Sequence, residues 1–202
     1  MPEPVAGVIL AAGRSSRLGT NKLLIELGGE TVVRRAARQA LEAGLSPVIV
    51  VLGFEEERVA AALDGLAIQK VVNRRHEEGM HASLQAGIER VPAECGAAVV
   101  ILADMPLVTA RMLEQIVARF RSAGAPLVIS LYGEVQAPPT LYARALFPAL
   151  AESGAGGGQQ VVREYREQAT PLHWPAPLRA DLDRPEDIAR VRRELPSDGP
   201  AA

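Results

Sequence analysis

Cysteine and aromatic residues are scarce in this chain. Cys95 is the only cysteine among 202 residues, and aromatic side chains make up 3%. One thiol excludes an intramolecular disulfide and a metal cluster built from several cysteines. The apolar residues, 48% of the chain, are therefore mostly aliphatic, which suits helices packed on a buried parallel sheet.

The chain also lacks a marked excess of charge and a long apolar run. Its formal net charge is −2, and no block of like charges provides the basic surface that neutralises a nucleic-acid backbone. The longest apolar runs, residues 47–52 and 97–103, are too short to span a bilayer, and residues 1–4 lack the features of a secretion signal. We therefore expect a cytoplasmic protein without nucleic-acid or membrane partners, in which a local site holds any anionic ligand.

Strand-like apolar runs alternate with helical segments along the sequence. The expected strands cover residues 5–11, 47–52, 68–73, 97–103 and 127–131, with a short one at 140–142. The expected helices cover residues 31–43, 55–63, 80–90, 110–123, 144–152, 159–165 and 185–195. This alternation predicts an α/β fold, a three-layer αβα sandwich with a mainly parallel sheet. No linker divides the chain, so we expect one domain over residues 1–202 with a disordered tail from about residue 197.

Parallel sheets also predict where a ligand binds. Sites in such folds lie beyond the carboxyl ends of the strands, where the strand order reverses. In this sequence, the rule points to the segments just after Ala11, Asn73 and Ala103.

The first of these segments runs from Ala12 to Lys22 and contains many small residues. Its backbone permits close approach by a ligand, and several N–H groups can converge on phosphate oxygens. Arg17 and Lys22 add fixed positive charge. The segment matches neither G-x-x-x-x-G-K-[ST] nor G-x-G-x-x-G. Taken alone, it is also compatible with a surface turn that carries two solvated cations.

Carboxylates follow other expected elements. Asp104 comes directly after the apolar run 97–103, where it could hold Mg²⁺ between triphosphate oxygens or simply begin a turn. Asp181 and Asp183 alternate along an extended segment, so both could face one cation. Asp183 could instead cap the last helix, with Glu186 as its partner.

Four segments carry a family resemblance. Residues 10–24, L-A-A-G-R-S-S-R-L-G-T-N-K-L-L, resemble the signature loop of nucleotidyltransferases with the nucleotide-diphospho-sugar transferase fold. The resemblance is closest to the molybdenum cofactor cytidylyltransferases, within the molybdopterin nucleotidyltransferase family. Residues 104–108 resemble the G-D-M-P segment of that family, residues 79–87 its G-M-S-x-S-L-x-x-G segment, and residues 181–187 its D-x-D-T-P-E-D segment.

The resemblance implies a fold, a reaction and a set of site residues. It implies a GT-A-like fold and a Mg²⁺-dependent enzyme that moves a nucleoside monophosphate from an NTP to a phosphorylated small molecule. It implies catalytic roles for Arg17, Lys22 and Asp104, and metal binding by Asp104 together with Asp181 or Asp183. The nucleotide-binding residues that it implies are Leu10, Ala11, Ala12, Gly13, Arg14, Ser15, Ser16, Arg17, Lys22, Asn73, Gly79 and Ser83.

The resemblance also implies the substrates. Ala12 and Asn21 stand where the related guanylyltransferases typically carry glycine and aspartate, which favours CTP over GTP. Molybdopterin is the implied acceptor, and a molybdenum hydroxylase apo-enzyme is the implied recipient of the product. The alternatives are a guanylyltransferase for the same cofactor, a nucleotidyltransferase for another phosphorylated acceptor, and a non-enzymatic molybdopterin chaperone. A chaperone would not require Arg17, Lys22 and Asp104 together.

The resemblance weakens between residues 132 and 166, where acceptor recognition is expected. The Gly-(His/Asn)-Pro-Val segment of the family is replaced by Q-A-P-P-T at 136–140, and the acidic turn that follows is replaced by glycines at 156–158. These glycines could cradle the phosphate of the acceptor or form a flexible turn, and we expect the flexible turn.

Smaller departures lie nearer the nucleotide segments. Ala103 replaces a family glycine, and His81 replaces a family serine. We expect no catalytic role for His81, and we expect Met80 and Leu84 to pack in the core.

Overall fold

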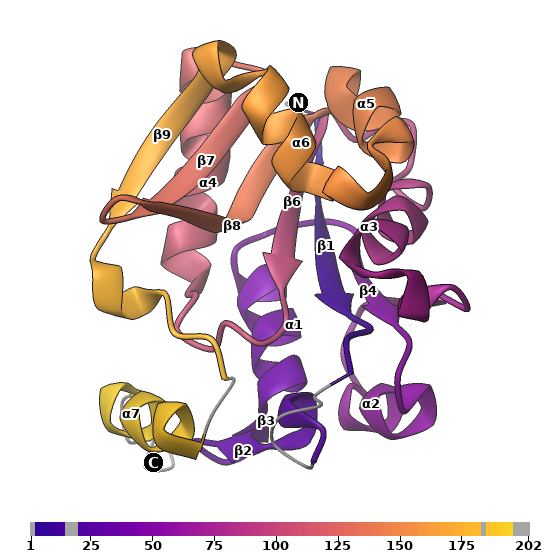
Figure 1. Ribbon diagram of the computed structural model, residues 1–202, viewed down its shortest axis with the longest axis vertical. Helices are drawn as coiled ribbons and strands as arrows, with labels where there is room; N and C mark the ends of the chain where they lie inside the picture. The colour runs from indigo at the N-terminus through magenta and orange to yellow at the C-terminus, as the bar shows by residue number, and fades with distance from the viewer. Residues whose placement is uncertain (1–2, 15–19, 183–184, 196–202) are drawn as a thin grey trace.

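The computed structural model describes residues 3–14, 20–182 and 185–195. A seven-stranded sheet forms its centre, in the order β5-β4-β1-β6-β8-β7-β9 (Figure 1). The strands are β1 (Val5–Ala11), β4 (Val48–Leu52), β5 (Gln69–Val72), β6 (Ala97–Leu102), β7 (Leu127–Tyr132), β8 (Val135–Ala143) and β9 (Ala169–Trp174). Of these seven strands, β8 alone runs antiparallel to its neighbours. The prediction of an α/β fold with a mainly parallel sheet is confirmed.

Helices cover both faces of the sheet (Figure 1). On one face lie α1 (Val32–Glu42), α2 (Glu56–Ala62) and α4 (Ala110–Ala123), and on the other lie α3 (Met80–Ile88), α5 (Phe147–Glu152) and α6 (Gly157–Glu164). A small hairpin, β2 (Glu26–Leu27) with β3 (Glu30–Thr31), and the helix α7 (Pro185–Glu194) lie at the end of the molecule toward which β1 and β6 point. Among the described residues, no helix combines the length and apolar character needed to cross a membrane.

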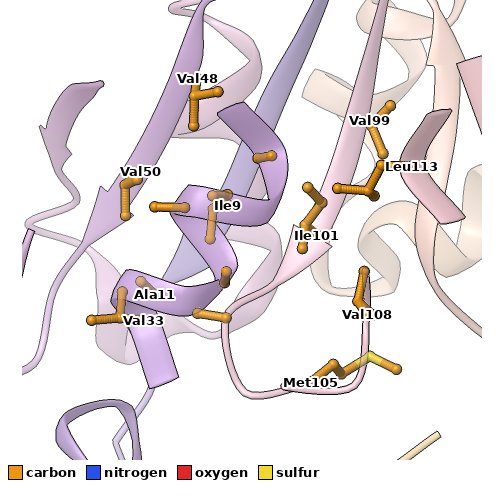
Figure 2. Close-up of a cluster of buried hydrophobic side chains, with 14 of the residues drawn as sticks. Ile9, Ala11, Val33, Val48, Val50, Val99, Ile101, Met105, Val108 and Leu113 are labelled. Atoms are coloured by element: carbon orange, nitrogen blue, oxygen red, sulfur yellow. The ribbon is translucent and has the colours of Figure 1, made fainter. Parts of the chain in front are cut away.

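Alternation along the strands explains why both faces need helices. Ile9 of β1 lies in the same buried cluster as Val33 of α1 and Leu113 of α4 (Figure 2). Its neighbour Val8 lies in a second cluster on the opposite face, with Leu84 of α3. Full burial of an aliphatic side chain contributes about 1.5–3 kcal/mol, so these two clusters fix the central strands between the helix layers.

The helix α4 has the ends that the sequence predicts. The Thr109 hydroxyl accepts a hydrogen bond from Met112 N at 3.3 Å, and Gly124 follows the last helical residue with φ of 62°. A left-handed residue at this position costs little for glycine.

The strand β8 is longer than the predicted strand at 140–142. It extends over nine residues and passes through Pro138 and Pro139, which have no N–H to donate. The prolines fall where the register between β7 and β8 shifts, between the pairs Val128–Leu141 and Ser130–Ala137, and irregular pairing of this kind accommodates residues without an N–H. The Ser130 hydroxyl also donates to the Pro139 carbonyl at 2.6 Å.

The strand β9 was missing from the sequence-based prediction. It contains Pro171 and has no fully buried residue, so it lacks the apolar run that marks the central strands. It pairs with β7 alone and forms an edge of the sheet, where a missing N–H is tolerated. The expected tail from residue 197 lies outside the described residues.

Candidate active site

The candidate site forms where the neighbouring parallel strands β1 and β6 end. Leu10 pairs with Leu102, so the segments that leave the two strands start side by side. From β1 the sheet extends through β4 to β5 on one side and through β6 on the other. The order of the strands therefore reverses at this point, where α/β sheets bind their ligands.

An ion pair joins the two segments. Lys22 Nζ lies 2.5 Å from Asp104 Oδ2, and the two side chains are 18% and 22% exposed. The buried Asn21 fixes the backbone at Lys22, because its side-chain oxygen accepts a hydrogen bond from Leu23 N at 3.1 Å and caps the short turn Lys22–Leu24. The structure thus brings together two of the three residues expected to be catalytic, whereas Arg17 lies outside the described residues.

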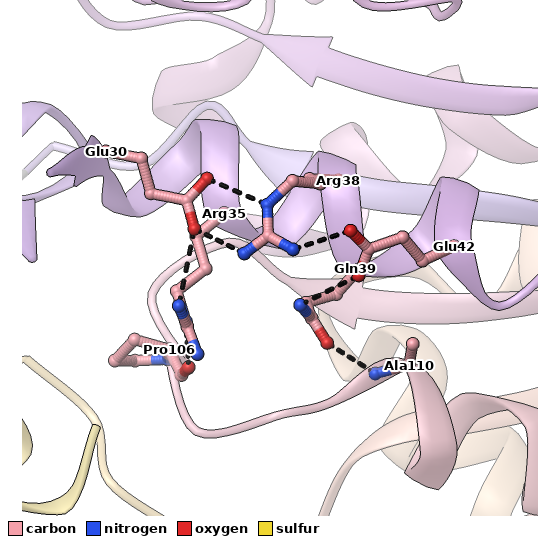
Figure 3. Close-up of polar contacts among 7 residues, drawn as sticks. All are labelled: Glu30, Arg35, Arg38, Gln39, Glu42, Pro106 and Ala110. Carbon is pink, nitrogen blue, oxygen red and sulfur yellow. Dashed lines mark hydrogen bonds and ion pairs between the residues drawn. The ribbon is translucent and has the colours of Figure 1, made fainter. Parts of the chain in front are cut away.

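Helix α1 holds the segment that follows Asp104 (Figure 3). The buried Arg35 donates from Nε to the Pro106 carbonyl at 2.9 Å, and Gln39 Oε1 accepts from the backbone N of Ala110 at 2.5 Å. Arg35 is itself held by the Glu30 carboxylate, at 3.3 Å.

Arg38 completes this network from the exposed side of α1. It pairs with the same Glu30 carboxylate at 2.5 Å and with Glu42 at 2.6 Å (Figure 3). Burial tends to raise the pKa of Glu30, but hydrogen bonds and charges from Arg38 and Arg35 hold the pKa below its ordinary value. Glu30 therefore stays ionised and keeps both arginines in place.

A cavity of about 270 Å³ surrounds the ion pair. It extends from the end of β1 to the first turn of α3 and contains most of the expected nucleotide-binding residues. Its lining residues are Leu10, Ala12, Gly13, Arg14, Lys22, Leu23, His76, Gly79, Met80, Ser83, Leu102 and Asp104. Arg14 lies at its rim, with the guanidinium carbon 5.3 Å from the centre of the Phe54 ring. We refer to this space as the smaller cavity.

Two expected nucleotide-binding residues do not line this cavity. Ala11 is buried in the core beside α1. Asn73 is buried as well, and its Nδ2 donates to Ser83 Oγ at 3.0 Å while its Oδ1 accepts from Arg75 N at 2.9 Å. Asn73 therefore orients Ser83, a role that spacing in the sequence does not reveal. Ser15 and Ser16 lie outside the described residues.

Asp181, one of the two candidates for a second metal-binding carboxylate, does not line the smaller cavity. Asp181 stands between the buried residues Ala180 and Leu182 and has one carboxylate oxygen 4.0 Å from Arg179 Nε. Burial, and then the charge of Asp181, raise the pKa of Tyr132. Asp183 lies outside the described residues.

The residues around Asp104 fit a magnesium ion that is held partly by the protein and partly by phosphate oxygens of a substrate. Within the described parts of the chain, no three His, Cys, Asp or Glu side chains are grouped closely enough to hold a metal. Magnesium is commonly held by one or two carboxylates together with phosphate oxygens of a substrate. A partly exposed carboxylate that opens into a cavity with cationic walls matches this arrangement.

A larger cavity of about 410 Å³ adjoins the smaller one. Its walls come from the start of α3, from β8, and from the glycine-rich turn that leads into α6. Four residues line both cavities: Leu10, Gly79, Met80 and Leu102. The two spaces are therefore neighbours that share a wall at the first turn of α3.

Met80 stands at this boundary and is 61% exposed, so the expectation of core packing is wrong for it. Leu84, one turn later on α3, is buried as expected. Met80 is the first residue of the helix, where the chain has not yet reached the sheet, and this position leaves its side chain at the mouth of both cavities.

The glycine-rich turn is packed against other walls of the larger cavity. Gly157 has φ of 51°, and a Cβ at this position would lie 3.4 Å from His81 Cβ. A Cβ on Gly158 would lie 2.7 Å from the Tyr142 hydroxyl, which donates to the Gly158 carbonyl at 3.2 Å. Burial raises the pKa of Tyr142, so its hydroxyl keeps the proton that it donates. The turn is thus a close-packed wall, although glycines alone predict only flexibility.

Charge is distributed unevenly between the two cavities. The described lining of the smaller cavity includes Arg14, Lys22 and Asp104, whereas the described lining of the larger one contains no lysine or arginine. The larger cavity has one carboxylate in its described lining, that of Glu78, and offers hydrogen-bonding groups on Gln136 and Thr140 beside apolar surface. The smaller cavity suits a phosphate chain with a cation, and the larger one suits a mostly uncharged group.

Sequence comparisons identify relatives along nearly the whole chain. The family described as "MobA-like NTP transferase domain" matches residues 7–193. The "Probable molybdenum cofactor guanylyltransferase" of Natronomonas pharaonis is 30% identical over 200 residues, which cover 94% of this chain and 97% of that protein. The "Bifunctional protein GlmU" of Anaeromyxobacter sp. strain Fw109-5 is 34% identical over 169 residues, which cover 81% of this chain and 33% of that protein. This chain spans 30% to 35% of the length of the first GlmU relatives.

Solved structures share the fold. Rv0371c from Mycobacterium tuberculosis H37Rv matches with a TM-score of 0.84 and 29% identity, over 95% of this chain and 98% of that one. A manganese complex of Rv0371C matches with a TM-score of 0.78 and 27% identity, over 96% and 100% of the two chains. The molybdopterin-guanine dinucleotide biosynthesis protein A of Archaeoglobus fulgidus matches with a TM-score of 0.68 at 18% identity, over 94% and 98%, which shows a common fold.

Proposed function

This chain belongs to the MobA-like NTP transferase family, and from that premise we propose that it transfers CMP from CTP to the terminal phosphate of molybdopterin and releases pyrophosphate. The observation that carries the proposal is the Lys22–Asp104 pair in a cavity lined by cationic side chains, next to a larger cavity without lysine or arginine in its described lining. The proposal includes a cytoplasmic location and a molybdenum hydroxylase apo-enzyme as the recipient of the product.

The two cavities suit the two substrates. The triphosphate would bind in the smaller cavity, with Lys22 and Arg14 at its oxygens and the backbone N–H groups of Ala12 and Gly13 in the loop around it. Arg17, outside the described residues, is proposed to act on the same phosphates. The ring system of the acceptor would occupy the larger cavity, and its phosphate would reach the boundary at Met80.

Asp104 would hold Mg²⁺, and the manganese complex of Rv0371C supports a divalent cation in this fold. When bound, Mg²⁺ neutralises charge on the triphosphate and on the attacking phosphate. Asp181 or Asp183 is proposed as a second carboxylate for the ion. Lys22 would stabilise the negative charge that develops on the departing pyrophosphate. The phosphate of the acceptor is already anionic at neutral pH, so no side chain has to remove a proton from the nucleophile.

The preference for CTP rests mainly on Ala12. Ala12 lines the smaller cavity, whereas the side chain of Asn21 caps its own turn. The guanylyltransferase relative from Natronomonas pharaonis favours GTP as the second candidate.

A pyrophosphate-release screen tests the proposal. CTP, GTP, ATP and UTP would each be supplied with and without molybdopterin, and with and without Mg²⁺. We expect release only when CTP, molybdopterin and Mg²⁺ are present together. Release with GTP would establish the second candidate. Release that requires a sugar or polyol phosphate, or molybdopterin binding without any release, would contradict both.

A further inference from the structure

The carboxylate proposed to hold the metal already contacts a cation from the chain itself. Lys22 Nζ lies 2.5 Å from Asp104 Oδ2, so the ammonium group and the carboxylate are in direct contact. Both groups are mostly shielded from water, with exposures of 18% and 22%, so the pair is screened less than a surface pair. A divalent cation that binds Oδ2 has to displace this ammonium group.

We propose that Lys22 occupies the cation position at Asp104 until the triphosphate arrives, and that the nucleotide then draws the ammonium group away, so that the divalent cation and the NTP enter the site together. This inference rests on the proposed function, because it uses Asp104 as the metal ligand. It adds a positioning role to Lys22: the residue controls when the metal site forms.

The geometry allows the ammonium group to move without moving the backbone. The turn Lys22–Leu24 is capped by Asn21, which fixes the Cα of Lys22, but the four-carbon stem of lysine is flexible. Arg14 lines the same cavity, so a triphosphate bound there would offer oxygens to both cations. Without a nucleotide, a divalent ion at Asp104 would meet the positive charge of Lys22 at contact distance and would have no phosphate oxygens to offset this repulsion.

Direct titration with Mn²⁺ tests the exchange, because electron paramagnetic resonance reports free Mn²⁺ without any turnover. The proteins are the wild type, Lys22→Met, Asp104→Asn and the double variant, all without nucleotide. Methionine keeps the length of the side chain and removes its charge. We expect Lys22→Met to bind Mn²⁺ about tenfold more tightly than the wild type, because the competing charge is gone, and we expect the double variant to lose this gain.

Lys70→Met is the matched control. Lys70 Nζ lies 2.7 Å from Asp64 Oδ1 in a solvent-exposed pair on another part of the surface, and neither residue lines the smaller or the larger cavity. This variant loses the same charge and should bind Mn²⁺ as the wild type does. A thermal melt of each variant confirms folding.

The outcomes separate the two proposals. If Asp104→Asn weakens Mn²⁺ binding but Lys22→Met binds no more tightly than the wild type, the exchange is wrong and the metal site stands. If Mn²⁺ binds equally well to every variant, Asp104 is not a ligand, and the metal assignment fails together with the exchange.

Discussion

At Ala12, a single methyl group separates this chain from the guanylyltransferase pattern. The residue is 4% exposed and lines the smaller cavity. Ala12→Gly should shift the ratio of kcat/KM for CTP and GTP toward GTP by about tenfold, since one methyl in a pocket changes discrimination by this order. The measurement is pyrophosphate release with each nucleotide at saturating molybdopterin. An unchanged ratio would remove the structural support for CTP.

Met80 offers a second test on a single side chain. Met80→Ala should raise the KM for both substrates about fivefold, because the side chain borders both cavities and a ligand would bury it. The melting temperature should change little, since the residue is 61% exposed. Val135→Ala is the control, because Val135 is 45% exposed and lines neither cavity. Equal effects of both variants on KM would exclude Met80 from the binding surface.

The sequence predicts single residues unequally well. Lys22 and Asp104 follow the ends of two apolar strands, and the structure pairs them. The exposure of Met80 and the hydrogen-bond partner of Asn73 could not be predicted, because both depend on which element packs against these residues. The helix α3 decides both, since it leaves Met80 uncovered and brings Ser83 to Asn73.

At the scale of helices and strands, the contact between α1 and the segment after Asp104 can be tested by mutation. Arg35→Met leaves the Pro106 carbonyl without its donor and should cost about 1–3 kcal/mol of unfolding free energy. It should also lower kcat about tenfold, since Asp104 loses its support. Urea unfolding and pyrophosphate release measure the two effects.

Arg38→Met is the control for this prediction. Arg38 pairs with the same Glu30 carboxylate as Arg35, but it also pairs with Glu42 of its own helix, whereas Arg35 donates to the segment after Asp104. The variant should lose stability and keep kcat. If Arg38→Met lowers kcat as much as Arg35→Met does, the contact with Pro106 has no special role.

The close packing of α3 on β1 carries another prediction. A Cβ on Gly87 would clash with Val8 Cγ1 and would lie 3.0 Å from Val51 Cγ2. Gly87→Ala should therefore destabilise the protein by about 1–3 kcal/mol in urea unfolding. Ala118→Ser adds one heavy atom on the exposed face of α4 and should stay within about 0.5 kcal/mol of the wild type. Equal stability of the two variants would contradict this close approach.

For the whole molecule, the alternation of apolar runs and helices was sufficient to predict the fold class. The order of the strands was not predictable, because it depends on crossovers that no local pattern encodes. The insertion of the antiparallel β8 beside β6 was also missed, since its proline pair obscures a strand of nine residues. This insertion matters for the site, because β8 supplies a wall of the larger cavity.

The proposed nucleotidyl transfer depends on Asp104 as the metal-binding carboxylate. The most direct measurement is pyrophosphate release from CTP with molybdopterin and Mg²⁺, compared between the wild type and Asp104→Asn, with Asp64→Asn as the surface control. We predict that Asp104→Asn releases pyrophosphate about 10²–10³-fold more slowly, with an unchanged melting temperature, and that Asp64→Asn keeps the wild-type rate. A folded Asp104→Asn protein with a near-normal rate would contradict the role of Asp104 as the metal-binding carboxylate.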